Sequence, residues 1–347
     1  ENGIGTSKDY IKAFYWYKQA SIKEYPPALI SLATCYELGQ GVEKNLKQAR
    51  KYYQKAAHLG YARGQFWLGY FYENHQEIKN AAYRCTYWYR QASKQNDVQA
   101  LVALGYCYES GFGVKKNLKK AVDLYLQAAK MNYAPGQCNL AYCYEIGIGV
   151  EVDLNKAIYY YHLASKANYP RAMCNLGYLY SHGQGMEVDH QKAFDLYLQA
   201  AKMNYAPGLY YTGLAYEEGN AVNVDIDKAI EYYQKATDLK NVVASCNLAY
   251  FYEMGIGVEQ DYQKAYELYL KGAKAGFARA ICNLGYCYEY GYGVEADIFQ
   301  AVEYYIEAAK LGYSEAIYSL GTCFEFGEGI EQNDERAFKC YEEAANQ

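Results

Sequence analysis

The sequence lacks the features that mark several large classes of protein. None of its apolar runs approaches the roughly 18 residues needed to span a bilayer. Lysine and arginine are spread along the chain without a basic block, and the formal net charge is -5, so nucleic-acid binding has no electrostatic support. No segment alternates apolar and polar residues with a period of two, so we expect no β-strands. These absences argue against a membrane-spanning protein and against a nucleic-acid-binding protein.

Catalytic and cofactor-binding motifs are also missing. The sequence contains no H-E-x-x-H, no G-x-S-x-G and no P-loop, and its recurring G-x-G pairs precede loops instead of joining a strand to a helix. Zinc binding is not expected, because there is no C-x2-C pair and the five histidines are scattered. We therefore expect a protein that is not an enzyme and that holds no metal and no cofactor.

The eleven cysteines are an odd number, which does not suit a disulfide framework. Cys138 and Cys143 lie five residues apart on one expected helix, which separates them by about 7.5 Å of rise and places them on different sides of it. This is a poor geometry for a disulfide. The N-terminus also lacks the charged and then apolar pattern of a signal peptide. We expect reduced, partly buried thiols in a cytoplasmic protein.

What the sequence does contain is one pattern that recurs every 36 residues from end to end. A core Tyr position is tyrosine in all ten copies: Tyr17, Tyr53, Tyr89, Tyr125, Tyr161, Tyr197, Tyr233, Tyr269, Tyr305 and Tyr341. Three residues later stands alanine, or glycine at Gly272. A fixed period between 20 and 50 residues is the signature of stacked repeats. Such chains usually offer a long surface to partners and no catalytic pocket.

Residues 26–61 show how one repeat is built. Apolar residues at 28, 32, 33 and 36 follow helical spacing and predict a first helix. Glycine at Gly39 and Gly41 ends that helix, because glycine readily adopts the left-handed cap conformation. Asn45 is the expected N-cap of a second helix, which ends near Gly60. The same N-cap position holds Asp9, Asn117, Asp153, Asp189, Asp225, Asp261, Asp297 and Asn333.

A small residue recurs in the middle of each first helix. This small-residue position is Ala33, Gly69, Gly105, Ala141, Gly177, Gly213, Ala249, Gly285 and Gly321. A glycine inside a helix costs about 1 kcal/mol relative to alanine. Its recurrence therefore predicts that a neighbouring helix approaches closely here, with the tyrosine rings filling the contact.

The consensus A-x3-L-G-x2-Y-x2-G-x-G-V-x2-D-x2-K-A-x3-Y-x2-A-A resembles the Sel1-like repeat family, which is related to tetratricopeptide repeats. Residues 280–309 carry it in Ala280, Leu284, Gly285, Tyr288, Gly291, Gly293, Val294, Asp297, Ala301, Tyr305, Ala308 and Ala309. The resemblance covers the whole chain. It implies an all-α fold, a right-handed α/α superhelical solenoid whose first helices line the concave side. It also implies an adaptor or scaffold role without catalysis.

We expect about nine and a half repeats of 36 residues in one solenoid domain over residues 1–347. Gly3 and Gly5 align with Gly39 and Gly41, so the chain begins in the middle of a repeat and is expected to be a fragment of a longer protein. The second full repeat has residues 74–77, Asn-His-Gln-Glu, in place of G-x-G. Its first helix either runs on or is followed by a reshaped loop.

Three further positions of the first helix lie away from its expected core face. The groove Tyr position is occupied by Tyr70, Tyr106, Tyr142, Tyr178, Leu214, Tyr250 and Tyr286, between Thr34 and Thr322. The Glu position is occupied by Glu37, Glu73, Glu109, Glu145, Glu217, Glu253, Glu289 and Glu325, with Ser181 as the exception. The Asn position includes Asn139, Asn175, Asn247 and Asn283.

Each of these positions has two interpretations. The tyrosines either contact a ligand or pack between adjacent first helices. The glutamates either form an acidic groove edge or pair with a basic position, which is Lys12, Arg84, Lys120, Lys156, Lys192, Lys228, Lys264 and Arg336. The asparagines resemble the ladder that holds a peptide backbone in some tetratricopeptide superhelices, because an amide both donates and accepts. Their alternative is hydrogen bonding to the neighbouring repeat.

The leading hypothesis is a non-catalytic scaffold or adaptor that binds a partner protein or an extended, possibly basic peptide in a concave groove. Its proposed contacts are Asn139, Asn175, Asn247, Asn283, Tyr106, Tyr142, Tyr178, Tyr250, Tyr286, Glu109, Glu145, Glu253 and Glu289. A second hypothesis is the regulatory or targeting arm of a multidomain enzyme, such as a kinase, whose catalytic domain lies outside this chain. A third is an architectural solenoid that self-associates through an uncapped end.

Overall fold

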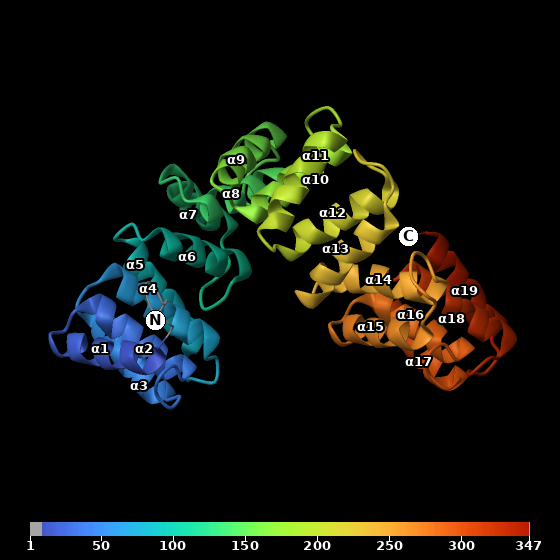
Figure 1. Cartoon of the computed structure of the whole chain (residues 1–347), viewed down its shortest axis with the longest axis horizontal. Helices are drawn as coiled ribbons and strands as arrows, with labels where there is room; N and C mark the ends of the chain where they lie inside the picture. Colours follow the sequence, from blue (N-terminus) through green and yellow to red (C-terminus); the bar gives the residue numbers. More distant parts are fainter. Residues whose placement is uncertain (1–8, 347) are drawn as a thin grey trace. The chain divides into compact units, whose positions relative to one another are not determined.

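The structure is a computed structural model of the chain and describes residues 9–346. Within that range the protein is entirely helical, with nineteen helices and no strand (Figure 1). The chain forms two compact units, one that ends at Ala172 and one that begins at Met173. The expectation of an all-α repeat fold is confirmed. The expectation of one solenoid domain over residues 1–347 stays a prediction, and the alignment of Gly3 and Gly5 lies outside the described residues.

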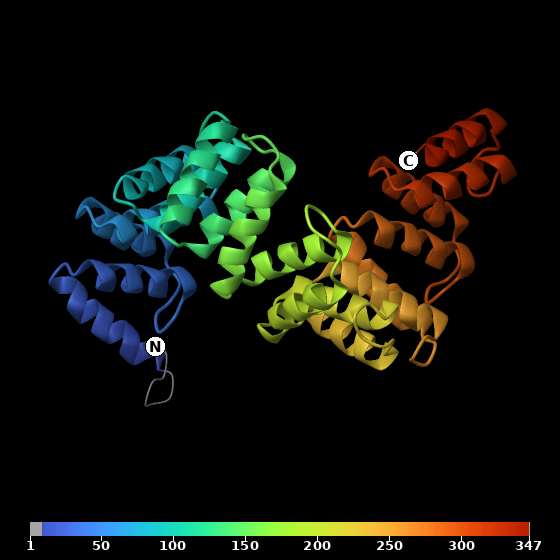
Figure 2. The same ribbon diagram turned by 90° about the horizontal axis from the view of Figure 1, so that it is seen from above.

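The first unit contains the helices numbered one to nine. Their bounds are α1 (Tyr10–Ile22), α2 (Pro26–Leu38), α3 (Leu46–His58), α4 (Ala62–Asn74), α5 (Ala81–Ser93), α6 (Val98–Ser110), α7 (Leu118–Lys130), α8 (Ala134–Ile146) and α9 (Leu154–Lys166). The division between the two units falls within α10 (Pro170–His182). In this unit α2, α4, α6 and α8 each pack on the second helix of their own repeat, and α3, α5 and α7 pack in turn on the next first helix (Figure 2).

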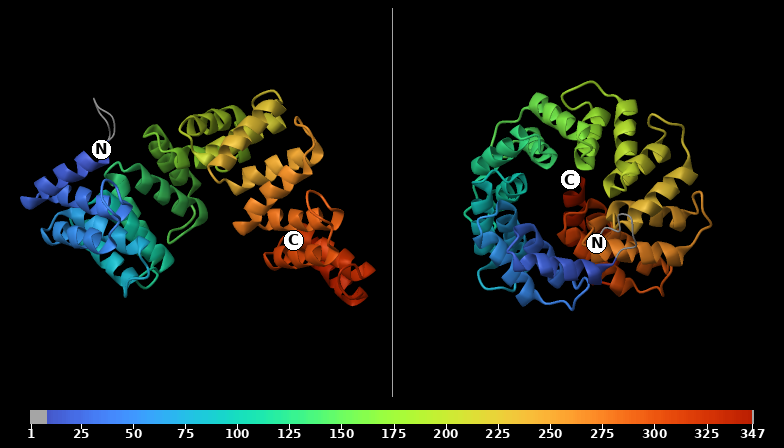
Figure 3. Two further views of the ribbon diagram at one scale, coloured as in Figure 1. Left: turned by 60° about the horizontal axis from the view of Figure 1, so that its bottom comes forward. Right: turned by 60° about the vertical axis from the view of Figure 1, so that its left-hand side comes forward.

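The second unit repeats this arrangement. Its helices are α11 (His190–Lys202), α12 (Ala206–Glu218), α13 (Ile226–Asp238), α14 (Val242–Met254), α15 (Tyr262–Lys274), α16 (Ala278–Tyr290), α17 (Ile298–Lys310), α18 (Ser314–Phe326) and α19 (Asp334–Ala345). Figure 3 shows the same succession of paired helices from two further directions. The even-numbered helices from α2 onward are the first helices, and the odd-numbered ones from α3 onward are the second helices.

The helix ends lie where the local sequence predicts them. Gly39 caps α2 with φ of 72°, in the left-handed region that favours glycine. The side chain of Asn45 then accepts a 3.1 Å hydrogen bond from the backbone N–H of Gln48 and caps α3. The residues at the equivalent N-cap position do the same in α1, α7, α9, α11, α13, α15, α17 and α19.

In the second full repeat the first helix does not run on, and a reshaped loop follows it. Helix α4 ends at Asn74, as long as its neighbours, and His75 follows it without a left-handed residue. The amide nitrogen of Gln76 donates to the carbonyl oxygens of Tyr72 and Glu73 at 2.9 and 2.7 Å, which satisfies two carbonyl groups at the helix end. The ring of His75 lies on Phe71, with 4.4 Å between centroids.

The core of each repeat is a tyrosine ring packed on the small-residue position. A Cβ added to Gly69 would lie 2.6 Å from Cδ1 of Tyr89, so only glycine permits this approach. Gly105, Gly177, Gly213 and Gly321 face the rings of their own core tyrosines in the same way. The close contact predicted from the recurring glycine is therefore present, and it is made by the ring that the sequence singled out.

Candidate functional site

The core tyrosine and the Glu position of each repeat are joined by a hydrogen bond. The Tyr53 hydroxyl donates to Oε2 of Glu37 at 2.8 Å, and the Tyr125 hydroxyl donates to Oε2 of Glu109 at 2.7 Å. Equivalent bonds join Tyr89 to Glu73, Tyr161 to Glu145, Tyr233 to Glu217, Tyr269 to Glu253, Tyr305 to Glu289 and Tyr341 to Glu325. Each pair is 16 residues apart, so the carboxylate of a first helix meets the ring of the second helix.

Helix geometry explains this pairing. Gly69 and Glu73 are four residues apart and therefore lie on the same face of α4, one turn from each other. The Tyr89 ring crosses α4 at Gly69, and its hydroxyl reaches Glu73. Burial, and after it the neighbouring carboxylate, raises the pKa of tyrosines in this position, as at Tyr125 and Tyr233. The hydroxyls thus stay protonated and act as donors.

The interpretation that the glutamates pair with the basic position is wrong for the described residues. Lys156, Lys192 and Lys228 instead pair with the N-cap aspartates of their own helices, each at 2.9 Å. The same ammonium groups lie over the rings of Tyr144, Tyr180 and Tyr216, between 4.9 and 5.3 Å from the centroids. The basic side chains therefore stabilise the start of the second helix. The glutamates instead accept hydrogen bonds from the buried tyrosine hydroxyls.

Three members of the Asn position contact the repeats beside them. Asn139 on α8 accepts a 3.2 Å bond from Nη1 of Arg171, and Asn247 on α14 accepts a 3.0 Å bond from Nη1 of Arg279. The amide nitrogen of Asn283 on α16 lies 3.7 Å from the sulfur of Cys246. Asn175 is half-buried on α10. The geometry thus contains the inter-repeat bonds of the second interpretation, while no described residue accepts a bond from the amide nitrogen of Asn139.

The groove Tyr position is the most exposed of the three. Tyr106 on α6 and Tyr250 on α14 are 56% and 41% exposed, although both are large aromatic residues. Tyr142 on α8, Tyr178 on α10 and Tyr286 on α16 are half-buried. The hydroxyl of Tyr286 lies 2.8 Å from Oγ of Ser319 on the next first helix. Some of these rings bridge adjacent first helices, and others present their area to solvent.

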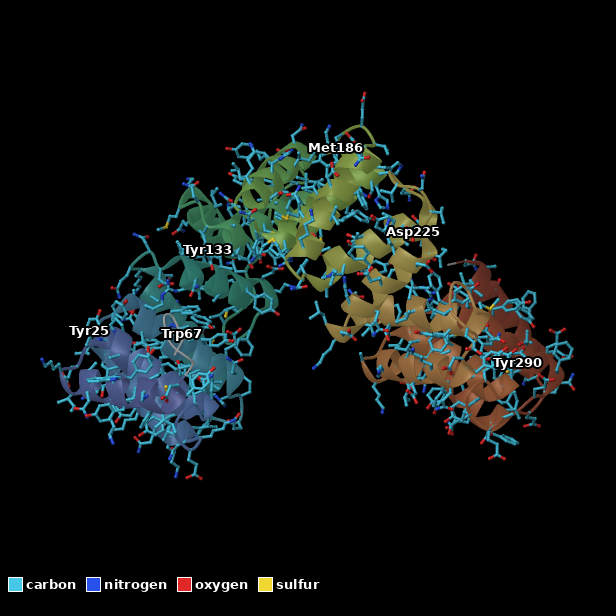
Figure 4. All side chains as sticks on the ribbon, viewed as in Figure 1. Tyr25, Trp67, Tyr133, Met186, Asp225 and Tyr290 are labelled. Atoms are coloured by element: carbon cyan, nitrogen blue, oxygen red, sulfur yellow. The ribbon has the colours of Figure 1, made fainter. Side chains whose placement is uncertain are left out.

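A hollow in the first unit brings several aromatic residues together. It has a volume of about 370 Å³ and is lined by residues of α4 and α6, by Tyr89 of α5 and by Tyr133, which precedes α8. Phe66, Trp67 and Tyr70 form its α4 side, and Tyr70 is 40% exposed. Trp67 and Tyr133 are labelled in Figure 4. Residues of three successive first-helix segments thus form a single surface.

The sequence reasoning missed Phe66, Trp67 and Tyr133 as candidate contacts. A signal was present, because Trp67 occupies the Asn position of its repeat, where an indole ring has no counterpart in the other copies. The predicted residues are distributed evenly along the first helices, as the 36-residue period requires. The structure brings Phe66, Trp67 and Tyr133 together beside Tyr70.

The repeats match a known family model from residue 1 to residue 347. The model is described as the Sel1 repeat and matches ten segments: 1–24, 26–61, 62–97, 98–133, 134–169, 170–205, 206–241, 242–277, 278–313 and 314–347. The chain belongs to the Sel1 repeat family. Proteins with Sel1 repeats are generally protein-interaction scaffolds and are typically non-catalytic.

Solved Sel1-type structures resemble the chain. A protective antigen of uropathogenic Escherichia coli with an SLR fold is 30% identical at a TM-score of 0.68, over 99% of this chain and 74% of that one. A Sel1 repeat protein from Oxalobacter formigenes is 28% identical at a TM-score of 0.63, over 70% of this chain and 96% of that one. Among curated proteins the comparison found no match.

Membrane-spanning helices and metal-binding clusters are both absent from the described residues. No helix within residues 9–346 is both long enough and apolar enough to cross a bilayer. The described residues contain no group of three or more histidine, cysteine, aspartate or glutamate side chains placed to hold a metal ion.

Proposed function

We propose that this protein is an interaction scaffold that binds an extended peptide segment of a partner protein along its first helices. The observation that carries the proposal is the aromatic hollow of the first unit. Tyr70 and, one first helix further on, Tyr106 expose large rings that the core does not require. Exposed aromatic rings beside a hollow are typical of binding surfaces, since a ring contributes much contact area and loses little entropy.

Hydrogen-bonding groups and charge beside the rings support a peptide as the ligand. The amide nitrogen of Asn139 can donate to a peptide carbonyl, and Asn175 and Asn283 occupy the same position in other repeats. Asn247 also occupies it, but it is buried and its amide nitrogen donates to the Tyr233 hydroxyl at 3.2 Å. Glu109 and Glu145 use Oε2 for the core tyrosines, which leaves a second carboxylate oxygen on each. Glu253 and Glu289 repeat this arrangement in the second unit. We propose a basic peptide, whose affinity falls as salt concentration rises.

A peptide selected from a random library against this protein provides the test. We expect Tyr70→Ser and Tyr106→Ser each to weaken its binding by about tenfold, as measured by fluorescence anisotropy. The matched control is Tyr83→Ser on α5, because Tyr83 is 65% exposed but belongs to a second helix. Equal losses in all three variants, or a selected peptide that ignores Tyr70 and Tyr106, would reject the groove as the binding surface.

A specific observation also favours self-association through α1. This helix exposes Ile11 and Trp16 at 72% and 66%, an unusual amount of apolar surface for a single helix. We propose that α1 is the contact by which copies associate. Light scattering should then show a mass that rises with protein concentration, and Ile11→Glu combined with Trp16→Glu should abolish the rise. A constant monomer mass in the unmodified protein would reject this proposal.

We also propose a reducing compartment, the cytoplasm, for this protein. All eleven cysteines are free thiols, and ten of them are buried among the repeats. Small buried thiols pack as apolar residues and need no oxidising environment. Fractionation of cells that express the protein, with detection in the cytoplasmic or the exported fraction, is the direct measurement.

A further inference from the structure

One repeat departs from the pairing that the others share. In eight repeats the core tyrosine donates its hydroxyl hydrogen to a glutamate carboxylate. In the remaining described pair, Ser181 stands at the Glu position opposite Tyr197. The two hydroxyl oxygens are 3.4 Å apart, which is a long contact for O–H···O. Tyr197 is therefore the core tyrosine, among the described pairs, that has no glutamate carboxylate opposite its hydroxyl.

A second departure lies beside the first. The groove Tyr position of the following repeat holds Leu214 on α12, between repeats that have tyrosine there. Ser181 and Leu214 are both smaller than the residues they replace, and they border the same cavity of about 290 Å³ in the second unit. These two departures from the repeat pattern thus border one cavity, and together they leave volume that a longer carboxylate side chain and a tyrosine ring fill in other repeats.

The cavity has an apolar floor and one buried donor. Phe194 and Tyr197 are buried in its floor, and the ring of Tyr211 stacks on Tyr197 with 4.7 Å between centroids. Burial raises the pKa of Tyr197, so its hydroxyl keeps the proton at neutral pH. Ser181 is already engaged, because its hydroxyl lies 3.0 Å from the carbonyl oxygen of Tyr178 and 2.8 Å from Nδ1 of His182. The Tyr197 hydroxyl is consequently the group that a ligand would meet.

The rim of the cavity leaves an entrance for an anion. His182 and His190 are exposed there, and an imidazole N–H can donate a hydrogen bond to an anion. The acidic group at the rim, Glu218, accepts a 2.6 Å hydrogen bond from the amide nitrogen of Asn220, which offsets part of its charge. The walls are apolar, the floor holds a hydrogen-bond donor, and the volume suits a short chain that ends in a polar group.

We propose that this cavity binds an aliphatic carboxylate of about the size of a glutamate side chain, whose oxygen takes the hydrogen bond of Tyr197. The ligand carboxylate would accept a hydrogen bond from Tyr197, as Glu145 and Glu253 do from the core tyrosines of their own repeats. The source of the carboxylate is either a free small acid or a glutamate side chain of a bound protein. This site belongs to the second unit and the aromatic hollow to the first, and the peptide proposal does not depend on it.

Propionate is the probe for the free acid, because it reproduces the end of a glutamate side chain. Ligand-observed NMR at constant ionic strength should show saturable binding, with a dissociation constant on the order of 1–10 mM for so small a molecule. Propionamide has the same shape without the charge and should bind at least tenfold more weakly. N-acetylglutamate N-methylamide represents the protein side chain. Binding of propionate alone points to a free acid, and binding of both probes points to a side chain.

Three variants separate the parts of the site. Ser181→Glu restores the residue that the other repeats carry, so it should fold, gain stability and lose propionate binding. Tyr197→Phe keeps the ring but removes the donor and should weaken propionate binding about tenfold, as expected for a charge-assisted hydrogen bond. Ser181→Ala is the matched control, because it keeps the space and the donor and should bind propionate as the unmodified protein does.

The outcomes decide the proposal directly. Equal binding of propionate and propionamide would overturn it, because the carboxylate would then not be recognised. Unchanged propionate binding in Ser181→Glu would place the binding elsewhere and overturn it as well. The absence of saturable binding of both carboxylate probes to the unmodified protein would show that the cavity does not take this class of ligand.

Discussion

The hydroxyl of Tyr161 donates a 2.5 Å hydrogen bond to Oε2 of Glu145, across the two helices of one repeat. The tyrosine ring is buried, and the carboxylate is half-buried at the surface of the first helix. The bond thus connects the Glu position at the surface of the first helix to the core tyrosine. A substitution of Glu145 therefore also affects the core, although this residue lies at the surface of its helix.

Removal of this bond should destabilise the repeat to a graded extent. We expect Tyr161→Phe to lower the free energy of unfolding by about 1–2 kcal/mol, because Glu145 loses its buried donor. Tyr161→Ala should cost about 3–5 kcal/mol, because the ring is also lost. Urea denaturation measures both values. Tyr159→Phe, an exposed neighbour on α9, is the control and should stay within about 0.5 kcal/mol of the unmodified protein.

The damage from Tyr161→Ala should also stay local. Each repeat contacts only its neighbours, so repeats distant from α9 should keep their stability. Hydrogen exchange should show loss of protection around α8 and α9 and little change near α2 and α18. A uniform loss of protection across all described helices, with a single cooperative transition, would contradict this expectation.

Alkaline pH should unfold the protein through the buried tyrosines. Burial raises the pKa of Tyr125, Tyr233 and Tyr305 above the usual tyrosine value of about 10. The folded state therefore keeps protons that the unfolded state releases, and the stabilisation is fully present below pH 10 and is lost as pH rises above it. Urea denaturation at increasing pH should show this decline, together with delayed tyrosinate absorbance. Stability that is constant from pH about 9 to about 11 would contradict it.

Alanine in place of Gly69 should destabilise the protein. An alanine Cβ at residue 69 would come within 2.6 Å of the Tyr89 ring, so Gly69→Ala should cost about 1–3 kcal/mol despite the better helix propensity of alanine. Thermal denaturation measures the loss. The matched comparison is Ala141→Gly, which creates no clash and should cost only about 0.5–1 kcal/mol. A stabilised Gly69→Ala protein would show that the ring moves freely.

The thiols should react in two groups. Burial raises the pKa of Cys246 and Cys323 to about 11, and that of Cys138 to about 12, so these residues form little thiolate at neutral pH. Cys340 on α19 is half-buried, whereas the other ten are buried. We expect Cys340 to react first with a thiol reagent in the native protein and all eleven cysteines to react in denaturant. Cys340→Ser should remove the fast phase, and stable intrachain disulfides would contradict the prediction.

The sequence by itself determined the helices, their ends and the family. Helix caps such as Gly39 and Asn45 act on backbone groups within a few residues, and apolar periodicity identifies the buried face from the same short window. The 36-residue period then places every later copy. The role of the small-residue position also followed from the sequence, because a recurring glycine inside a helix needs a packing reason.

Only the tertiary structure decided which side chains meet. Glu145 bonds Tyr161 and not a lysine, because the ring passes a small residue and emerges beside the carboxylate. Asn247 meets Arg279 from the next repeat, and Ser181 meets the wall that contains Leu214. These partners lie 16 to 33 residues apart, beyond the reach of local sequence signals. The direction of each side chain and the distance between the packed helices determine which side chains meet. The residue pattern of a single helix specifies neither.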